Sequence, residues 1–346
     1  MKKPVCVILG AGASADAWSE GGPVPRSTGL RPPVAREVFN FGSRADFYSV
    51  ARTYPGVQAL AAELGELGGR SLEARLREYA DDPRDLVKRY FPQVPLYLRD
   101  LLVKVTTEYT PGGAHPGNHI RLCLGLLKEH PVAFLDLNYD DYLEEALPVC
   151  DGTLAVTSLD DYVKTGRQAI VGKVHGSIHW GTPIAQPPQD ESAAHLISEY
   201  CNYDPPGECH DLIFQPSRKN TFNWREPDTR RLLFPVLTAP LAGKDHTALV
   251  CPKGHLDALK TFLKGCEHYL VIGTSAQDED LLNFLRSSVL SVQLVHYVNH
   301  QDGANACKAN FENSSRTFLN AHRRFVFDEG FRAYLSSDHF QNFLNA

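Results

Sequence analysis

A glycine-containing loop directly after a short apolar run is the feature of this sequence that most constrains its fold. Residues 4–9, Pro-Val-Cys-Val-Ile-Leu, are rich in β-branched side chains, which predicts a strand buried on both faces of a parallel sheet. Gly10, Ala11, Gly12, Ala13 and Ser14 follow at once. There the missing side chains would let the backbone approach a pyrophosphate, and amides at a helix N-terminus would face its charge. The loop therefore predicts the first turn of a nucleotide-binding α/β fold.

This loop departs from the dinucleotide-binding pattern G-x-G-x-x-G in two respects. Ala15 occupies the third glycine position. No acidic residue in a recognisable context follows about twenty residues later to bind a ribose. The alternative explanation for Gly10 and Gly12 is a tight turn that packs a helix against a strand. Other segments of the sequence are needed to distinguish this turn from a phosphate-binding loop.

Apolar runs alternate with helical patterns through the second half of the chain. This alternation predicts an α/β fold with a doubly wound, Rossmann-like parallel sheet. The 346 residues are interpreted as one domain, residues 1–346, with an early helical insertion at about 40–128 and an irregular insertion at about 181–245. The tail beyond residue 305 is expected to add a helix, a short strand and a final helix. The predicted strands after the first are 132–137, 169–174, 247–251, 268–272, 292–298 and 324–327, with helices at 140–147, 257–264 and 278–290.

Composition and charge exclude several classes of protein. Hydrophobic residues make up 43% and charged residues 22% of the chain, as in ordinary globular proteins. The net charge is −6, and no basic run is longer than a pair such as Arg230-Arg231 or Arg323-Arg324, so no direct nucleic-acid binding is expected. The first apolar run is too short for a signal peptide, and no other stretch is long enough to span a membrane. We therefore expect a cytoplasmic protein without membrane contact, whose eight scattered cysteines are reduced thiols.

Polar residues follow the predicted strand at 132–137. Asn138 and Asp140 would lie at the carboxyl edge of the sheet, where ligands bind in open parallel sheets. The Asn138 side chain supplies donors and an acceptor, and Asp140 can orient a neighbouring amide or hydroxyl. Capping of the next helix explains both residues equally well, because Asn and Asp are favoured at that position.

A histidine follows the predicted strand at 169–174 and should reach the same edge. Imidazole suits proton transfer near neutral pH, and Gly176 leaves space for a substrate, so His175 is a candidate catalytic base. His179, four residues later, is a rival that its spacing does not exclude. Two further strand ends carry groups that suit a phosphate or a ribose, namely Gly273, Thr274 and Ser275 in one and Asn299 in the other.

Taken in this order, the segments resemble the sirtuin family and its bacterial NAD-hydrolysing relatives, discontinuously from about Val5 to Asn299. The resemblance implies that Asn138 and Asp140 shape the nicotinamide and ribose pocket, and that His175 is the catalytic base. NAD would be the substrate. The residues implied to hold its pyrophosphate, phosphate and adenosine-ribose side are Gly10, Gly12, Ala13, Ser14, Gly273, Thr274, Ser275 and Asn299.

Departures from the deacylating sirtuins bear on the activity. Those enzymes carry a zinc ribbon of two C-x-x-C pairs between the H-G and G-T-S segments, whereas the cysteines of this interval are spaced too widely for one. Asp136 stands where the family usually has threonine, and the loop at 22–26 matches the family's Pro-Asp-Phe-Arg segment only loosely. These traits resemble the defence-associated hydrolases, and no metal is expected. The alternative is an irregular metal site made of Cys201, Cys209, His210, Cys251 and His255.

The resemblance thus implies an NAD glycohydrolase, which converts NAD to nicotinamide and ADP-ribose, acting as a regulated toxic effector in bacterial anti-phage defence. Asn138, steered by Asp140, would order the attacking water or ribose hydroxyl, and His175 would accept a proton. The alternatives are an NAD-dependent protein deacylase and a non-catalytic NAD or ADP-ribose-binding module. A dehydrogenase ranks below both, because no sequence feature specifies a second substrate.

An unrestrained NAD hydrolase would kill its own cell, so its activity must be controlled. No sensor segment is recognised after Asn299. We therefore expect control by homo-oligomerisation or by a separate regulatory protein, such as the ATPase or Argonaute-like sensor of related defence systems.

Overall fold

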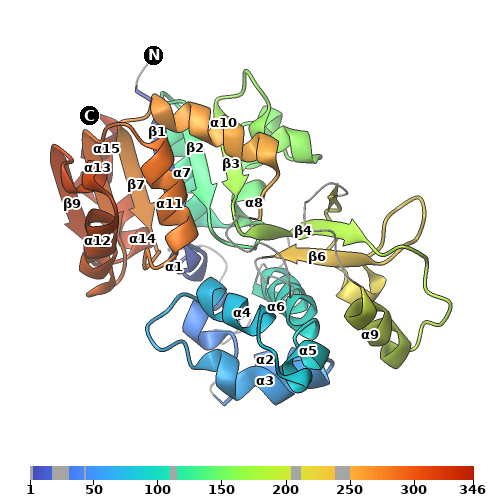
Figure 1. Ribbon diagram of the computed structural model, residues 1–346. Coiled ribbons are helices and arrows are strands. Elements are labelled where there is room, and N and C mark those ends of the chain that lie inside the picture. Colours follow the sequence, from blue (N-terminus) through green and yellow to red (C-terminus); the bar gives the residue numbers. More distant parts are fainter. Residues whose placement is uncertain (1–2, 18–30, 43, 110–114, 204–211, 238–249) are drawn as a thin grey trace. The chain divides into compact units, whose positions relative to one another are not determined.

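The computed structural model describes residues 3–17, 31–42, 44–109, 115–203, 212–237 and 250–346, drawn in colour in Figure 1. Contacts between residues divide the chain into two compact units. The first unit combines Met1–Val24, Gly112–His175 and Cys251–Ala346, and the second combines Pro25–Pro111 and Gly176–Val250. The interpretation of residues 1–346 as one domain remains a prediction.

A six-stranded parallel sheet is the centre of the first unit (Figure 1). All five residues of its strand β1 are fully buried, as an apolar run covered on both faces requires. The strand order is β3-β2-β1-β7-β8-β9. These strands are β1 (Val5–Leu9), β2 (Val132–Asp136), β3 (Ala169–Lys173), β7 (His268–Ile272), β8 (Leu294–Val298) and β9 (Arg323–Phe327).

The order of the strands reverses between β1 and β7. From β1 the chain proceeds outward to β2 and β3 on one side, and from β7 to β8 and β9 on the other. This is the order of a doubly wound sheet, so the predicted Rossmann-like fold class is confirmed.

The strands end level with one another. Leu9 of β1 pairs with Asp136 of β2 and with Ile272 of β7, and Asp136 pairs in turn with Lys173 of β3. Residues that follow these strands therefore share one edge of the sheet.

Helices of the first unit form two layers. Helices α10, α11 and α12 contact one another in sequence and are seen in front of the strands in Figure 1, while α7 packs on both α8 and α14. Their bounds are α1 (Ala11–Ala15), α7 (Gly117–Leu127), α8 (Tyr142–Cys150), α10 (Lys253–Lys264), α11 (Glu279–Ser288), α12 (Gly303–Ser314), α13 (Arg316–Leu319), α14 (Phe331–Leu335) and α15 (Asp338–Leu344). The tail contains helices on both sides of β9, as predicted.

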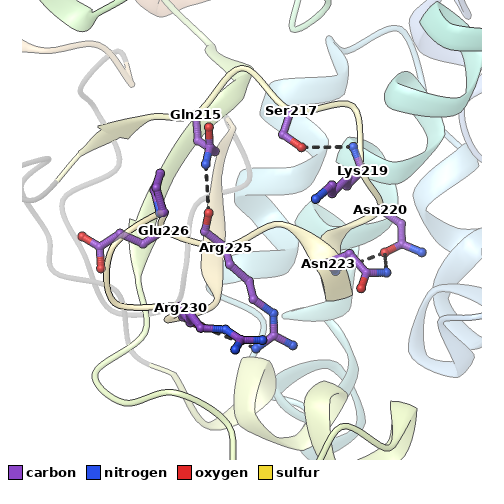
Figure 2. Close-up of a pocket in the computed structure, with 9 residues that line it drawn as sticks. Gln215, Ser217, Lys219, Asn220, Asn223, Arg225, Glu226 and Arg230 are labelled. Carbon is purple, nitrogen blue, oxygen red and sulfur yellow. Dashed lines mark hydrogen bonds between the residues drawn. The ribbon is translucent and has the colours of Figure 1, made fainter.

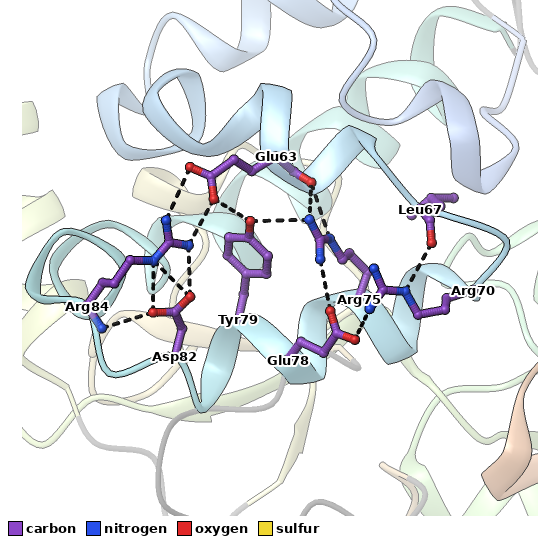
Figure 3. Close-up of polar contacts among 8 residues, drawn as sticks. All are labelled: Glu63, Leu67, Arg70, Arg75, Glu78, Tyr79, Asp82 and Arg84. Atoms are coloured by element: carbon purple, nitrogen blue, oxygen red, sulfur yellow. Dashed lines mark hydrogen bonds and ion pairs between the residues drawn. The ribbon is translucent and has the colours of Figure 1, made fainter.

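The predicted helical insertion at about 40–128 is helical, and its last helix, α7, belongs to the first unit. A surface network joins three of the other helices: the carboxylate of Glu63 receives hydrogen bonds from Arg84 and Tyr79, and its carbonyl receives two from Arg75 (Figure 3). These links fasten α3 to α4 and to the start of α5. The helices are α2 (Ala45–Ala51), α3 (Pro55–Gly65), α4 (Leu72–Ala80), α5 (Asp85–Tyr90) and α6 (Gln93–Tyr109).

The segment predicted as an irregular insertion, about 181–245, carries more regular structure than its Pro- and Asn-rich sequence indicates. Strand β4 (Gly176–Pro183) pairs antiparallel with β5 (Ile213–Phe214) and β6 (Leu233–Leu237), and α9 (Ala193–Asn202) lies between β4 and β5 in the chain. The predicted strand at 247–251 falls mostly outside the described residues. None of the helices in the described ranges is long and apolar enough to cross a membrane.

Candidate functional site

The candidate site lies where the strand order of the large sheet reverses. Open parallel sheets bind ligands at this position, outside the carboxyl ends of the strands. Gly10 follows β1 and Gly273 follows β7. Two backbone hydrogen bonds join the loops: Gly10 donates to the Ile272 carbonyl at 2.9 Å, and Gly12 donates to the Gly273 carbonyl at 2.8 Å.

Packing of the two loops against each other explains their glycines. A Cβ at Gly12 would come within 2.8 Å of the Gly273 Cα. Gly273 has a φ of +68°, and a Cβ there would lie 2.2 Å from the Ala13 nitrogen. The Gly12 amide is bound to Gly273, and the Ala13 amide donates to the Gly10 carbonyl at 2.8 Å. Packing between the two loops therefore accounts for Gly12 and Gly273, and the pyrophosphate role of Gly10, Gly12, Ala13 and Ser14 remains a prediction.

Asn138 and Asp140 play different structural parts. The Asn138 side-chain nitrogen donates to the Gly10 carbonyl at 3.1 Å and so joins the end of β2 to the glycine loop. Asp140 accepts a hydrogen bond from the amide of Tyr142, the first residue of α8, at 3.3 Å. Asp141 is the N-cap residue of α8, so Asp140 stands one position before the cap, whereas the Asn138 side chain is directed to the loop of β1. Both side chains are buried.

His175 is paired with an acidic residue that sequence reasoning missed. Its Nε2 lies 2.8 Å from Oδ2 of Asp278, and both side chains are largely buried. Asp278 caps α11, where its other oxygen accepts from the amides of Asp280 and Leu281. Burial opposes ionisation of Asp278, but the hydrogen bond and charge of His175 outweigh it and lower the pKa of this carboxyl.

The rival histidine, His179, belongs to the second unit. It lies on β4, where its ring meets that of Phe214 with a centroid distance of 5.9 Å. The chain leaves the first unit directly after His175. Of the two histidines, only His175 therefore extends from the parallel sheet, and the ring of Tyr139 is its neighbour at a centroid distance of 6.3 Å.

Two further predicted segments are joined to this edge. The Asn299 side-chain nitrogen donates to the Thr274 carbonyl at 3.2 Å, and the Thr274 hydroxyl accepts from the Ala276 amide at 3.1 Å. The Ser275 carbonyl receives the side chain of Asn310 at 2.8 Å, and Ser275 itself is exposed. The structure thus gathers the ends of β1, β2, β7 and β8, while the ligand-binding roles of Gly273, Thr274, Ser275 and Asn299 remain predictions.

A buried group of charges lies at the ends of β2 and β3, close in the chain to Asn138 and His175. The Lys173 ammonium is fully buried, lies 3.0 Å from Oδ2 of Asp136 and 3.5 Å from Glu144, and donates to the carbonyl of Asp140. Tyr162 donates to Glu144 at 3.0 Å. Lys173 and Asp136 each stand two positions before a candidate site residue, so their ion pair fixes the ends of neighbouring strands.

Burial and the neighbouring charges together shift the pKa values of these side chains. Burial disfavours the ammonium form of Lys173, but the carboxylates of Asp136, Glu144 and Asp140 outweigh it and raise the pKa of Lys173. Burial also raises the pKa of Glu144 to about 7 and that of Asp140 to about 6. Both carboxyl groups therefore exchange protons near neutral pH.

A metal site finds no support among the described residues, which contain no group of three or more His, Cys, Asp or Glu side chains able to hold an ion. Of the alternative site, Cys209 and His210 lie outside the described residues. His255 stacks on the ring of Tyr162 at a centroid distance of 5.6 Å.

Comparison with known proteins gives similarity to solved structures only. No protein-family model and no curated protein matches the chain. A Sir2 homologue in complex with NAD is 15% identical, with 99% of this chain and 91% of that chain covered and a TM-score of 0.43. A Sir2 homologue bound to 2′-O-acetyl ADP-ribose is 16% identical, with coverage of 99% and 94% and a TM-score of 0.43. Sir2Tm bound to a propionylated peptide is 13% identical, with coverage of 99% and 94% and a TM-score of 0.40.

Proposed function

We propose that this chain binds NAD at the carboxyl edge of its parallel sheet and hydrolyses the bond between nicotinamide and ribose. The observation that carries the proposal is the pairing of His175 with Asp278, 2.8 Å apart, at the edge where Asn138 contacts the glycine loop. A histidine oriented by a buried carboxylate is an arrangement that serves general base catalysis. The strand order supports a dinucleotide as the ligand of this edge.

The reaction needs one base and one positioned water. The bond between the ribose C1′ and the nicotinamide nitrogen breaks, nicotinamide leaves as a neutral molecule, and water forms the new bond to C1′ of an oxocarbenium-like centre. Asn138 orders the water or the ribose hydroxyl, and His175 takes up the proton that is released. Asp278 then stabilises the imidazolium. The products are ADP-ribose, nicotinamide and a proton.

The phosphates of NAD are assigned to the loops that follow β1 and β7, at the same edge of the sheet. Because the amides of Gly12 and Ala13 already have protein partners, they contact phosphate only if those hydrogen bonds are exchanged. The exposed Ser275 offers its hydroxyl without such an exchange, and Asn299 is joined to the same loop through Thr274.

Site variants test this assignment. His175→Ala and Asn138→Ala should each lower NAD consumption by at least about 100-fold, the range of a lost general base. The matched control is His322→Ala, which removes an exposed histidine of the first unit and should leave the rate unchanged. If both site variants consume NAD at the parental rate, under conditions where the parent is active, the assignment is wrong.

We further propose that the hydrolysis serves anti-phage defence and is controlled by oligomerisation or by a partner chain. The support is chemical: free hydrolysis of NAD is lethal, so the activity must be held back until a trigger acts. Release of O-acyl-ADP-ribose from an acylated peptide would instead favour the deacylase alternative. Tight NAD binding without turnover would favour the binding module.

A further inference from the structure

The second unit contains a polar cavity that the proposed NAD chemistry does not use. Its volume is about 630 Å³, within the range of small-molecule sites, and it lies on the segment that joins β5 to β6 (Figure 2). None of its lining residues belongs to the first unit. Those that matter here are Gln215, Ser217, Lys219, Asn223, Arg225 and Arg230.

The charge of this cavity is unbalanced in favour of cations. Lys219, Arg225 and Arg230 line it, whereas Glu226 is its one carboxylate. Glu226 is already bound by Arg231 at 2.8 Å, and Arg225 is paired with Glu191 at 2.5 Å. Within the described residues, neither Lys219 nor Arg230 has an ion-pair partner. The cavity therefore presents two uncompensated cations in a chain whose net charge is −6.

A buried arginine, Arg99, forms hydrogen bonds with the backbone of the cavity wall that carries Lys219. Arg99 is fully buried and donates to the carbonyls of Ser217 and Lys219, both at 2.9 Å, and to Ile178 at 3.0 Å. Its guanidinium stacks on Trp224, 3.7 Å from the ring centroid. Because a buried guanidinium is costly unless its donors are used, these contacts hold the loop in one conformation.

A second buried group fixes the adjoining turn. Asp100 accepts hydrogen bonds from both the amide and the hydroxyl of Thr221, at 2.6 and 2.5 Å, and Tyr200 donates to the Thr221 carbonyl at 2.9 Å. Thr221 begins the short helix that carries Asn223 into the cavity lining. The polar wall is therefore preorganised before any ligand arrives, which lowers the entropy lost on binding.

The opposite wall is held in an unfavourable backbone conformation. Arg230 has a φ of +59°, a region that residues other than glycine rarely adopt. Its amide donates to the Glu226 carbonyl at 3.1 Å, and Arg225 reaches the Arg230 carbonyl at 3.5 Å. Strained backbone of this kind is common at ligand-binding sites. A glycine would relieve the strain, but it would not provide the guanidinium of Arg230.

We propose that this cavity binds a small phosphorylated ligand. A lysine ammonium supplies a point charge and an arginine a planar fork, the pair of groups that proteins use for phosphate oxygens. The polar lining disfavours an apolar ligand, and a volume of about 630 Å³ suits a small molecule. The proposal does not depend on NAD hydrolysis.

Calorimetric titration with inorganic pyrophosphate tests the site. The parental protein should bind it, and Lys219→Met and Arg230→Gly should each weaken binding by about tenfold or more, the usual effect of losing one charge-assisted hydrogen bond. Arg230→Gly also relieves the positive φ, so its melting temperature should not fall. The control Lys88→Met removes an exposed lysine of α5 in the same unit and should bind as the parent does.

Three results would overturn the proposal. The first is no binding of pyrophosphate by the parental protein at millimolar concentration. The second is equal affinity in the parent, Lys219→Met and Arg230→Gly, which would place any binding elsewhere, for example at the glycine loop of the first unit. The third is tighter binding of a single-stranded RNA than of pyrophosphate, with the same dependence on Lys219, which would identify an extended polyanion as the ligand.

Discussion

His175 Nε2 and Asp278 Oδ2 lie 2.8 Å apart, although about a hundred residues separate them in the chain. Asp278 holds two roles at once, since its other oxygen caps α11. Through these two contacts, Asp278 links the imidazole of His175 to the start of α11 in the first unit. Asp278 is therefore a positioning residue for the proposed base.

Replacement of Asp278 by asparagine separates these two roles. Asparagine caps helices as well as aspartate does, so Asp278→Asn should change the free energy of unfolding by less than about 1 kcal/mol. It removes the charge that stabilises the imidazolium, so NAD consumption should fall by about 100-fold or more. Glu279→Gln, in the same helical turn and exposed, should leave the rate unchanged. Full activity of Asp278→Asn would remove Asp278 from the mechanism.

Removal of the buried ammonium of Lys173 should strongly destabilise the chain. Lys173→Met leaves Asp136 and Glu144 as buried carboxyl groups without their cation, so it should lower the free energy of unfolding by about 3–5 kcal/mol. Urea denaturation at neutral pH measures this. The double variant Lys173→Met/Asp136→Leu should recover part of the loss. Lys128→Met, an exposed lysine after α7, should stay within about 0.5 kcal/mol of the parent.

Glu144 should make stability depend on pH. Its pKa is raised from an ordinary 4.5 to about 7, so the folded chain binds this proton more tightly than the unfolded chain does. The contribution is therefore present below pH 4.5 and is lost as the pH rises toward 7. A shift of this size corresponds to roughly 3 kcal/mol. Glu144→Gln should show a smaller loss of stability than the parent between these pH values, and identical slopes for the two would contradict the assignment.

Gly273 should tolerate no side chain. Gly273→Ala places a Cβ 2.2 Å from the Ala13 nitrogen on a backbone with a φ of +68°, so we expect a loss of at least about 2 kcal/mol in unfolding free energy. The matched control is Gly254→Ala in α10, where a Cβ would meet nothing within 4 Å. That variant should be as stable as the parent or more so. Thermal denaturation of the two variants side by side decides between these outcomes.

The sequence patterns predicted the strands of the large sheet well because each is a short apolar run next to a turn or loop. Strand β1 and the glycine loop were found together, and Asn138, His175, Gly273 and Asn299 follow β2, β3, β7 and β8, the two strands on either side of β1. Parallel strands with level ends bring such residues together whatever the distance along the chain.

The residues that could not be found from the sequence are those whose role depends on contact with a residue far away in the chain. Lys173 appeared as one polar residue inside an apolar run, and only the register of β2 and β3 places it beside Asp136. Asp278 could have been recognised as a helix cap, but no local signal pairs it with His175. The antiparallel sheet of the second unit was missed because β5 has only two residues and because long segments rich in proline and polar residues separate its strands.

Quantification of nicotinamide and ADP-ribose after incubation of NAD with the purified chain, alone and together with the products of neighbouring genes and without any peptide, tests the central claim most directly. We predict that the two products appear in equal amounts and that His175→Ala abolishes both. Stable binding of NAD with no release of nicotinamide under all of these conditions, and with or without an acylated peptide, would contradict the assignment of this edge as a hydrolytic site.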